Sequence, residues 1–349
     1  MSQRVNPEMI ILARESRGMT QLDLAKRIRM TQGYVSKVEN DIYEASEEMV
    51  NRMVQTLKYP QEFFFEPYRS HHLGMGFYRK HKSLPSRLKA EIDAYANLHR
   101  MRIQKMLRIV ELTDSRVVER AINEHGSPEE IARAIREYWR VSRGPIQNLT
   151  GILEQAGVIV IRLPLDTRHF SGVYLPTEQL IYIILTNGIM PADRDRFTLA
   201  HELGHIIMHR LPTETMEEEA DRFAAEFLMP SQELGSQLYK LSLERLATLK
   251  RYWKVSMAAL LEQALRLGAV TERKYRSLRA ELAQAGYILH EPPELAPPEE
   301  KPSLLYELID LYLNQLQYSV DELSRFLRLF KHEFLSLYMP SHQHLRVMP

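Results

Sequence analysis

The sequence predicts a mostly helical protein of the α+β class, and three observations lead to this prediction. Apolar residues recur three and four positions apart over most of the chain, which is typical of amphipathic helices. Runs rich in β-branched and aromatic residues are confined to residues 158–187, which predicts a small sheet. The chain has 349 residues, 44% of them apolar and 26% charged, which is enough for two or three globular domains.

Residues 1–66 predict a bundle of short helices. Thr20 and Thr31 each stand at the start of a helical segment as an N-cap, and Asp23 occupies the capping-box position after Thr20. Only a tight turn separates the two segments, which predicts a helix-turn-helix within the bundle. The apolar positions that set the helical period are Ile10, Ala13, Leu22, Leu24, Ala25, Ile28, Val35, Val38, Met49, Met53 and Leu57.

Residues 67–126 predict a basic helical connector. Residues 61–110 hold ten lysines and arginines against four acids, a local charge of +6. A stretch with this charge can lie near phosphates, or it can form a solvated helix face. Residues 85–112 begin with proline and keep helical periodicity, so we expect one long helix there.

Residues 127–290 predict a second domain that combines helices with a sheet. Ser127 caps a helix over residues 127–141, with Pro128 in its first turn and Glu130 at the capping-box position. A further short helix ends at Gly157. The runs VIVIRLP, FSGVYLP and LIYIILTN that follow predict three strands.

The segment FTLAHELGHIIMH carries two histidines four residues apart, His201 and His205. On a helix these side chains share one face, with Cβ atoms about 5–6 Å apart, so both imidazoles can bind one zinc ion. Glu202 points in another direction, as a general base requires. Gly204 permits another element, such as a strand, to pack closely. We expect His209 to pack or hydrogen-bond near the helix end, although it can also serve as an extra ligand.

A catalytic zinc needs a third protein ligand, and the acidic segment MEEEADRF offers three glutamates. Glu219 shares a helical register with Phe223, so we expect it to face inward. Glu217 and Glu218 are expected to face solvent. Partners that orient the zinc histidines are to be sought among Asp195, Asp221 and Arg222.

The order of these motifs resembles the ImmA/IrrE family of zinc metallopeptidases. The resemblance covers residues 127–290 and rests on RFTLAHELGHIIMH, then EADRFAAEFLMP, with the strand segments before them and RYWKVSMAALLEQALRLG after them. It implies a zincin-like metallopeptidase domain with a small sheet and a helical C-terminal region. It also implies that His201, His205 and Glu219 bind Zn²⁺ and that Glu202 is the base. The family often has asparagine where this chain has Asp221.

The segment MTQLDLAKRIRMTQGYVSKVEND resembles the XRE-type, or Cro/C1-type, helix-turn-helix. The resemblance implies that the second of the two helices enters the major groove of double-stranded DNA. Gln32, Tyr34 and Lys37 can then contact base edges or phosphates, and Thr20 and Gln21 can bind phosphate. The other candidate DNA-binding residues are Thr31, Gly33, Ser36 and Asn40.

The N-terminal unit is only weakly basic, with nine lysines and arginines against eight acids in residues 1–60. One copy is therefore expected to bind DNA weakly, and specific binding is expected to need a homodimer or the basic connector. A helical module that binds protein is the alternative.

Residues 291–349 begin with the proline-rich, acidic segment EPPELAPPEEKP, which predicts a linker before a small helical element. The chain has no cysteine, no secretory signal at its N-terminus and no apolar run long enough to span a membrane. We therefore expect a cytoplasmic protein without membrane attachment.

Taken together, these features predict a DNA-binding transcription regulator with a built-in zinc peptidase that cleaves or senses a protein partner, such as a repressor or a stress- or phage-related regulator. Two alternatives remain open. The zinc domain can be a sensor without proteolytic activity, or the chain can be an antitoxin-like regulator of a two-gene module.

Overall fold

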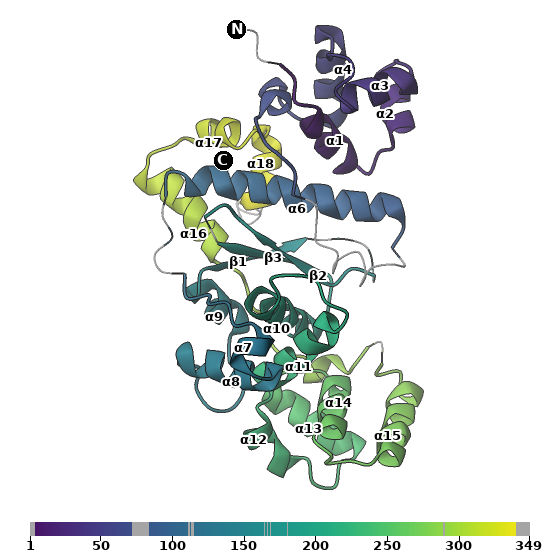
Figure 1. The fold of residues 1–349 in the computed structure, drawn as a ribbon, viewed down its shortest axis with the longest axis vertical. Helices are drawn as coiled ribbons and strands as arrows, with labels where there is room; N and C mark the ends of the chain where they lie inside the picture. The colour runs from purple at the N-terminus through teal and green to yellow at the C-terminus, as the bar shows by residue number, and fades with distance from the viewer. Residues whose placement is uncertain are drawn as a thin grey trace, which may run out of the picture.

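The computed structural model describes residues 4–71, 84–110, 112, 115–163, 165, 167, 169–179, 181–288 and 290–339. Residues 72–83 of the predicted connector and residues 340–349 of the predicted C-terminal element lie outside the described residues. Helices dominate, and one small sheet lies near the middle of the molecule (Figure 1). The predicted class, mostly helical α+β, is confirmed. Within the described residues, no helix is long and apolar enough to cross a membrane.

The N-terminal bundle consists of α1 (Pro7–Glu15), α2 (Gln21–Arg27), α3 (Gln32–Glu39), α4 (Glu47–Leu57) and the 3₁₀ helix η1 (Gln61–Phe65). The expected caps are present. The Thr20 side chain accepts from the amide of Asp23 and the Thr31 side chain accepts from the amide of Tyr34. All the predicted core positions of this bundle are buried except Leu22, which is exposed.

The long helix α6 (Ser86–Leu107) lies between the N-terminal bundle and the sheet (Figure 1). Leu98 and Met101 on one face belong to the core of the bundle. Ile103 and Met106 on the other face belong to the core between α6, the sheet and the C-terminal helices. One helix thus contributes to two hydrophobic cores.

The sheet has three strands, in the order β1 (Val158–Leu163), β3 (Tyr182–Asn187), β2 (Gly172–Pro176). β3 pairs in parallel with β1 and antiparallel with β2. Alternate residues face opposite sides, and both sides are covered. One side packs on α6 and the C-terminal helices, and the other packs on α10.

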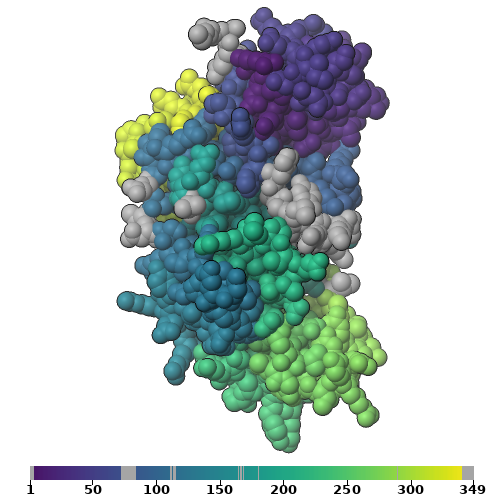
Figure 2. Space-filling model, in the orientation of Figure 1, coloured from purple at the N-terminus to yellow at the C-terminus, as the bar shows by residue number. Residues whose placement is uncertain are grey.

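Helices on the second side of the sheet form the rest of the predicted metallopeptidase domain. The His-containing helix α10 (Ala192–Met208) contacts β2 and β3 and packs against α11 (Met216–Leu228). The other elements of this domain are α8 (Pro128–Tyr138), α9 (Leu149–Gln155), α12 (Ser231–Leu234), η2 (Gly235–Gln237), α13 (Leu243–Trp253), α14 (Met257–Arg266) and α15 (Glu272–Gln284). The short helix α7 (Ile122–His125), from the end of the predicted connector, precedes them. The N-terminal bundle and α13–α15 lie at opposite ends of the molecule (Figure 2).

The proline-rich segment after residue 290 is held against the second domain by charged groups. Glu291 pairs with the buried Lys250 at 2.8 Å, and Glu300 pairs with the buried Arg196. The sequence predicted a linker here, but these buried contacts fix the segment to the domain surface.

The C-terminal element contains η3 (Pro293–Leu295), α16 (Leu304–Asp310), the π-helical turn η4 (Leu311–Gln315), α17 (Val320–Phe326) and α18 (Lys331–Tyr338). It packs beside α6 and also contacts the N-terminal bundle, through an ion pair of 2.7 Å between Arg17 and Glu333. Glu66, just after η1, pairs with both Lys105 of α6 and Arg328, at 2.9 and 2.7 Å.

Candidate functional site

His201 and His205 lie on the buried face of α10, and both rings are almost completely excluded from solvent. Their Nε2 atoms face each other at 3.0 Å. The glutamate that approaches them is Glu217 of α11, whose carboxylate oxygens lie 3.4 Å from Nε2 of each ring. These three side chains are the group in the described residues that can hold a metal ion.

The chemistry of this donor set fits zinc. Imidazole nitrogens and a carboxylate oxygen are ordinary zinc ligands, with metal–ligand distances of about 2.0–2.2 Å. Tetrahedral geometry at that distance separates neighbouring ligand atoms by about 3.3 Å. The separations of 3.0, 3.4 and 3.4 Å among the two Nε2 atoms and the carboxylate oxygens agree with this value.

The Nδ1 atoms of the two histidines are held by other side chains. Nδ1 of His201 lies 2.7 Å from the carboxylate of Asp221. Nδ1 of His205 lies 2.9 Å from Nδ1 of His209, whose Nε2 lies 3.0 Å from Glu219. Each Nε2 is thereby directed at the candidate metal position, because hydrogen bonds at Nδ1 fix the ring orientation.

The hydrogen-bonded series of side chains His205–His209–Glu219 also determines which ring nitrogens carry protons. If Nε2 of His205 binds a metal, its Nδ1 carries the proton and donates to Nδ1 of His209. The proton of His209 then lies on Nε2 and is donated to the Glu219 carboxylate. Burial and the nearby His205 lower the pKa of His209 to about 4. The His209 ring is therefore neutral, as it must be to accept at Nδ1 and donate at Nε2.

The geometry differs from the expectation that Glu219 faces the candidate zinc position, because Glu217 lies beside the two Nε2 atoms and Glu219 lies on His209. The sequence argument aligned Glu219 with Phe223, and Phe223 packs into the hydrophobic core. The face of α11 that meets the histidines is a different one. It carries Glu217 and, one turn later, Asp221. Glu218 is exposed, as expected.

Two glycines bring neighbouring elements close to α10. A Cβ on Gly204 would lie 3.1 Å from the Phe223 ring and 3.3 Å from Cα of Ala220, so the element packed here is α11 and not the expected strand. A Cβ on Gly172 of β2 would lie 2.6 Å from the Thr198 methyl group and 3.5 Å from Cγ of Glu202. The candidate base therefore lies against the start of β2.

Tyr174 of β2 is a residue of this site that the sequence did not indicate. Its ring stacks on the ring of His205, with centroids 6.1 Å apart. Burial, helped by the charge of Glu202, raises the pKa of Tyr174 to about 12, so its hydroxyl keeps its proton at neutral pH. The position of Tyr174 follows from strand register and sheet packing, which single-residue patterns in the sequence do not reveal.

The candidate DNA-binding residues lie together on one face of the N-terminal bundle. Gln32, Gly33 and Lys37 of α3 are exposed. A Cβ on Gly33 would meet nothing within 4 Å, so this turn of the helix is open to a partner. Ser36 and Asn40 are linked to each other, because the Asn40 amide donates to the Ser36 carbonyl at 2.7 Å.

A hydrogen-bonded network holds the glutamines of this face in place. The amide of Gln32 donates to Gln21 at 2.8 Å, and the amide of Gln21 donates to Glu39 at 2.8 Å. Glu39 is buried and accepts from the Arg14 guanidinium at 2.7 and 2.9 Å. The buried Arg14–Glu39 ion pair thus holds the side chains of Gln21 and Gln32, at the starts of α2 and α3, in a fixed orientation.

Tyr34 and Lys37 make a second cluster with Tyr43. The Lys37 ammonium lies 4.7 Å from the centre of the Tyr43 ring, and the Tyr34 hydroxyl donates to the Glu44 carbonyl at 3.3 Å. These side chains have partners within the bundle, so any contact with DNA competes with those partners.

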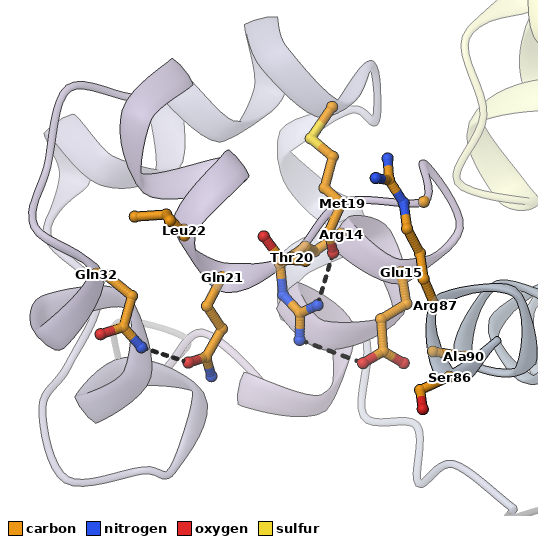
Figure 3. A pocket seen from close by; sticks show the side chains of 11 residues that line it. Arg14, Glu15, Met19, Thr20, Gln21, Leu22, Gln32, Ser86, Arg87 and Ala90 are labelled. Carbon is orange, nitrogen blue, oxygen red and sulfur yellow. Dashed lines mark hydrogen bonds and ion pairs between the residues drawn. The ribbon is translucent and has the colours of Figure 1, made fainter.

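A cavity of about 590 Å³ adjoins the glutamines, between the bundle and the start of α6. Gln32 and Gln21 lie on one side of it, and Ser86, Arg87 and Ala90 of α6 lie on the other (Figure 3). Arg87 is exposed. The beginning of the predicted connector helix therefore lies beside the candidate DNA-binding face.

Fold and site together define a protein in which a helix-turn-helix is joined to a domain with a paired-histidine candidate metal site. Comparison with known families agrees. Residues 10–63 match the model described as helix-turn-helix, and residues 153–265 match the peptidase family model described as the IrrE N-terminal-like domain. The chain is thus a fusion of these two kinds of domain, as the resemblances imply. No curated protein matches the chain.

Proposed function

We propose that this protein is a transcription regulator that binds an operator in double-stranded DNA as a homodimer and carries a zinc-dependent peptidase acting on a partner protein. The observation that carries the proposal is the convergence of His201, His205 and Glu217, with a buried glutamate, Glu202, beside them. Both family matches support it, since a helix-turn-helix and a peptidase-family domain occur in one chain.

In this proposal His201, His205 and Glu217 hold the zinc ion, and Asp221 and His209 keep the imidazoles oriented. Zinc held by these residues would supply a Lewis acid for a scissile carbonyl and would lower the pKa of water. Glu202 takes a proton from the attacking water and delivers it to the leaving amine.

The substrate is proposed to pair with β2 as an added strand. The two strands that precede the histidine helix, β2 and β3, are the candidates for this role. Because β3 lies between β1 and β2, only β2 of the two lies at an edge of the sheet. β2 also contacts α10, and its start lies against Glu202. A peptide on this edge would form main-chain hydrogen bonds beside the proposed metal centre.

A second candidate function, a zinc-dependent sensor without proteolysis, is favoured by one observation. α6 contributes to the core of the DNA-binding bundle and to the core beneath the sheet. A change at the metal domain can therefore reach the bundle through a single helix, without cleavage of any partner.

The test uses the purified full-length chain and the products of its neighbouring genes, with and without a chelator, read by intact mass. The proposal expects a partner to be cut at one position, with cutting abolished by the chelator and by Glu202→Gln. An uncut partner set, together with DNA binding that still depends on zinc, would favour the sensor.

A further inference from the structure

The start of α6 shares a cavity with the candidate DNA-binding face. Thr20 and Gln21 at the start of α2, and Gln32 at the start of α3, line the cavity of about 590 Å³. Ser86 and Arg87 of α6 line its other side (Figure 3). Three residues with expected roles in DNA binding thus adjoin two residues that lie outside the helix-turn-helix family match, which ends at residue 63.

Arg87 carries a charge that no ion pair neutralises. It is exposed, and within the part of the chain that the structure describes it makes no hydrogen bond or ion pair. Asp23 and Glu91 act on it through their charges from a greater distance. The other charged side chains that line the cavity, Arg14 and Glu15, are already paired with each other at 3.3 Å. Arg87 is therefore the charged lining residue that is available to bind a phosphate.

The guanidinium of Arg87 lies against the turn that leads into α2. A Cβ on Gly18 would lie 3.5 Å from its Nε and 3.7 Å from its Nη2. Thr20 and Gln21, which are expected to bind phosphate, follow this turn directly in the chain. A DNA strand that contacts the start of α2 therefore passes close to Arg87 as well.

Burial narrows the expectation that the basic connector lies near phosphates. Arg100 and Arg102 of α6 are buried, and Lys105 pairs with Glu66 at 2.9 Å. These cations belong to the packing of α6 and do not face a DNA strand. Arg87, near the beginning of the helix, is exposed. A phosphate contact is thus expected from this one residue and not from the charge of the segment as a whole.

The cores on the two sides of α6 fix the position of its first turn. Ala94 and Leu98 pack in the core of the N-terminal bundle, and Ile92 and Ala96 pack in the core between α6, the sheet and the C-terminal helices. Because the helix is held by both domains, a phosphate bound by Arg87 sets the position of the DNA relative to the second domain as well as to the bundle.

We propose that Arg87 binds a backbone phosphate of double-stranded DNA, so that the DNA-binding surface continues from α2 and α3 onto the first turn of α6. The inference rests on the proposed DNA binding and deepens it, because it adds a contact from outside the helix-turn-helix. An arginine–phosphate contact positions the duplex without reading its bases, so it strengthens binding to all sequences alike. It also adds to the weak positive charge of residues 1–60.

The first test measures how salt weakens binding of the full-length protein to a DNA fragment with the promoter of its own gene. Each phosphate contact contributes about 0.9 to the slope of log affinity against log salt concentration. Arg87→Gln should reduce this slope by about one per bound subunit and leave the base preference unchanged. Arg87→Lys keeps the charge and should retain the slope. Arg276→Gln, on an exposed position of α15, is the matched control and should bind as the wild type does.

Ethylation interference then locates the contact on the DNA. Ethylation removes the charge of a single phosphate, so the modified duplexes that fail to bind identify the phosphates that the protein contacts. At least one phosphate should interfere with binding of the wild type and not with binding of Arg87→Gln. Gln21→Ala should lose interference at a different phosphate. An unchanged midpoint of thermal unfolding in Arg87→Gln shows that the fold is intact.

The possible failures are distinguishable. A wild type that does not bind the promoter fragment overturns the proposed DNA binding, and this inference with it. Binding with an unchanged slope and an unchanged interference pattern in Arg87→Gln overturns the contact and leaves the helix-turn-helix function intact. Tighter binding by Arg87→Gln means that the start of α6 obstructs the DNA, and the inference is wrong. If inorganic phosphate binds the wild type but not Arg87→Gln, while the slope for DNA is equal in both, the cavity takes a small anion instead.

Discussion

The carboxylate of Asp221 lies 2.7 Å from Nδ1 of His201. Glu217, four residues earlier on the same helix, faces Nε2 of that ring at 3.4 Å. Residues four apart share a helix face, so one turn of α11 supplies both a candidate ligand and the group that orients another ligand. The spacing of acids along α11 thus places Glu217 at the candidate metal position.

The first prediction concerns that choice of glutamate. We expect the wild type to bind one zinc per chain and Glu217→Gln to lose stoichiometric zinc, because an amide is a much poorer ligand than a carboxylate. Glu218→Gln, on an exposed neighbour, is the control and should keep a full equivalent. Metal analysis after dialysis decides the matter. A full equivalent in Glu217→Gln would show that the ligand set is wrong.

The second prediction concerns the His205–His209–Glu219 chain. His209→Ala and Glu219→Gln should weaken zinc binding by about 10–100-fold, because partners that orient a ligand usually contribute that much. Both variants should still bind one equivalent at saturating zinc. Competition with a chromophoric chelator measures the affinity, and exposed His125→Ala serves as the control. If His209→Ala loses stoichiometric binding altogether, His209 is itself a ligand.

Periodicity in the sequence was sufficient to predict the helices of the N-terminal bundle, the three strands and the helix with His201 and His205. Each depends on residues close together in the chain. The third carboxylate could not be assigned in the same way, because two faces of α11 are in use. One packs Phe223 into the core and the other meets α10. Local periodicity therefore does not distinguish Glu217 from Glu219.

The sequence likewise did not reveal that residues 84–107 are packed between two hydrophobic cores. Their charge suggested a connector, yet several of the charged and polar residues of α6 are buried, among them Arg100 and Arg102. Burial of such residues depends on segments far away in the chain. Arg100, for example, donates to the Pro176 carbonyl at 2.8 Å. A local pattern carries no information about that partner.

The third prediction concerns recognition of DNA by Gln32. Gln32→Ala should weaken binding to the cognate operator by about 1–3 kcal/mol and relax the preference at one base pair, because an amide side chain can read an adenine edge. Gln55→Ala, on the exposed face of α4, should bind as the wild type does. Titration of promoter fragments with single base changes measures both effects. An unchanged base preference in Gln32→Ala would assign recognition to another residue.

The fourth prediction concerns Glu66, which joins the bundle to α6 and the C-terminal element. Burial raises the pKa of Glu66, but hydrogen bonds from Arg328 and Lys105 outweigh burial and hold it below the ordinary value of 4.5. Glu66→Gln should lower the free energy of unfolding at pH 7 by about 1–3 kcal/mol, since charged hydrogen bonds contribute this much. Urea unfolding of the full chain measures the loss, and Glu62→Gln, on an exposed position of η1, is the control.

The sign of the pH dependence follows from the lowered pKa of Glu66. A carboxyl whose folded pKa is depressed stabilises the protein above its unfolded pKa, and this contribution is lost as pH falls through the folded pKa. The difference in stability between wild type and Glu66→Gln should therefore shrink as pH falls below 4.5. A difference that stays constant down to pH 3 would show that Glu66 does not act through its charge.

The last prediction separates the enzyme from the sensor. Glu202→Gln keeps the size and shape of the side chain but removes the base, so zinc content, fold and DNA binding should all survive. If the protein is a peptidase, cleavage of its partner should fall by about 10²-fold or more, in line with the loss of general-base catalysis. His201→Ala removes a proposed ligand and should abolish zinc binding as well. A reporter driven by the protein's own promoter then gives the decision. Equal loss of response in both variants supports catalysis, whereas loss in His201→Ala alone means that zinc acts here as a structural or sensory element.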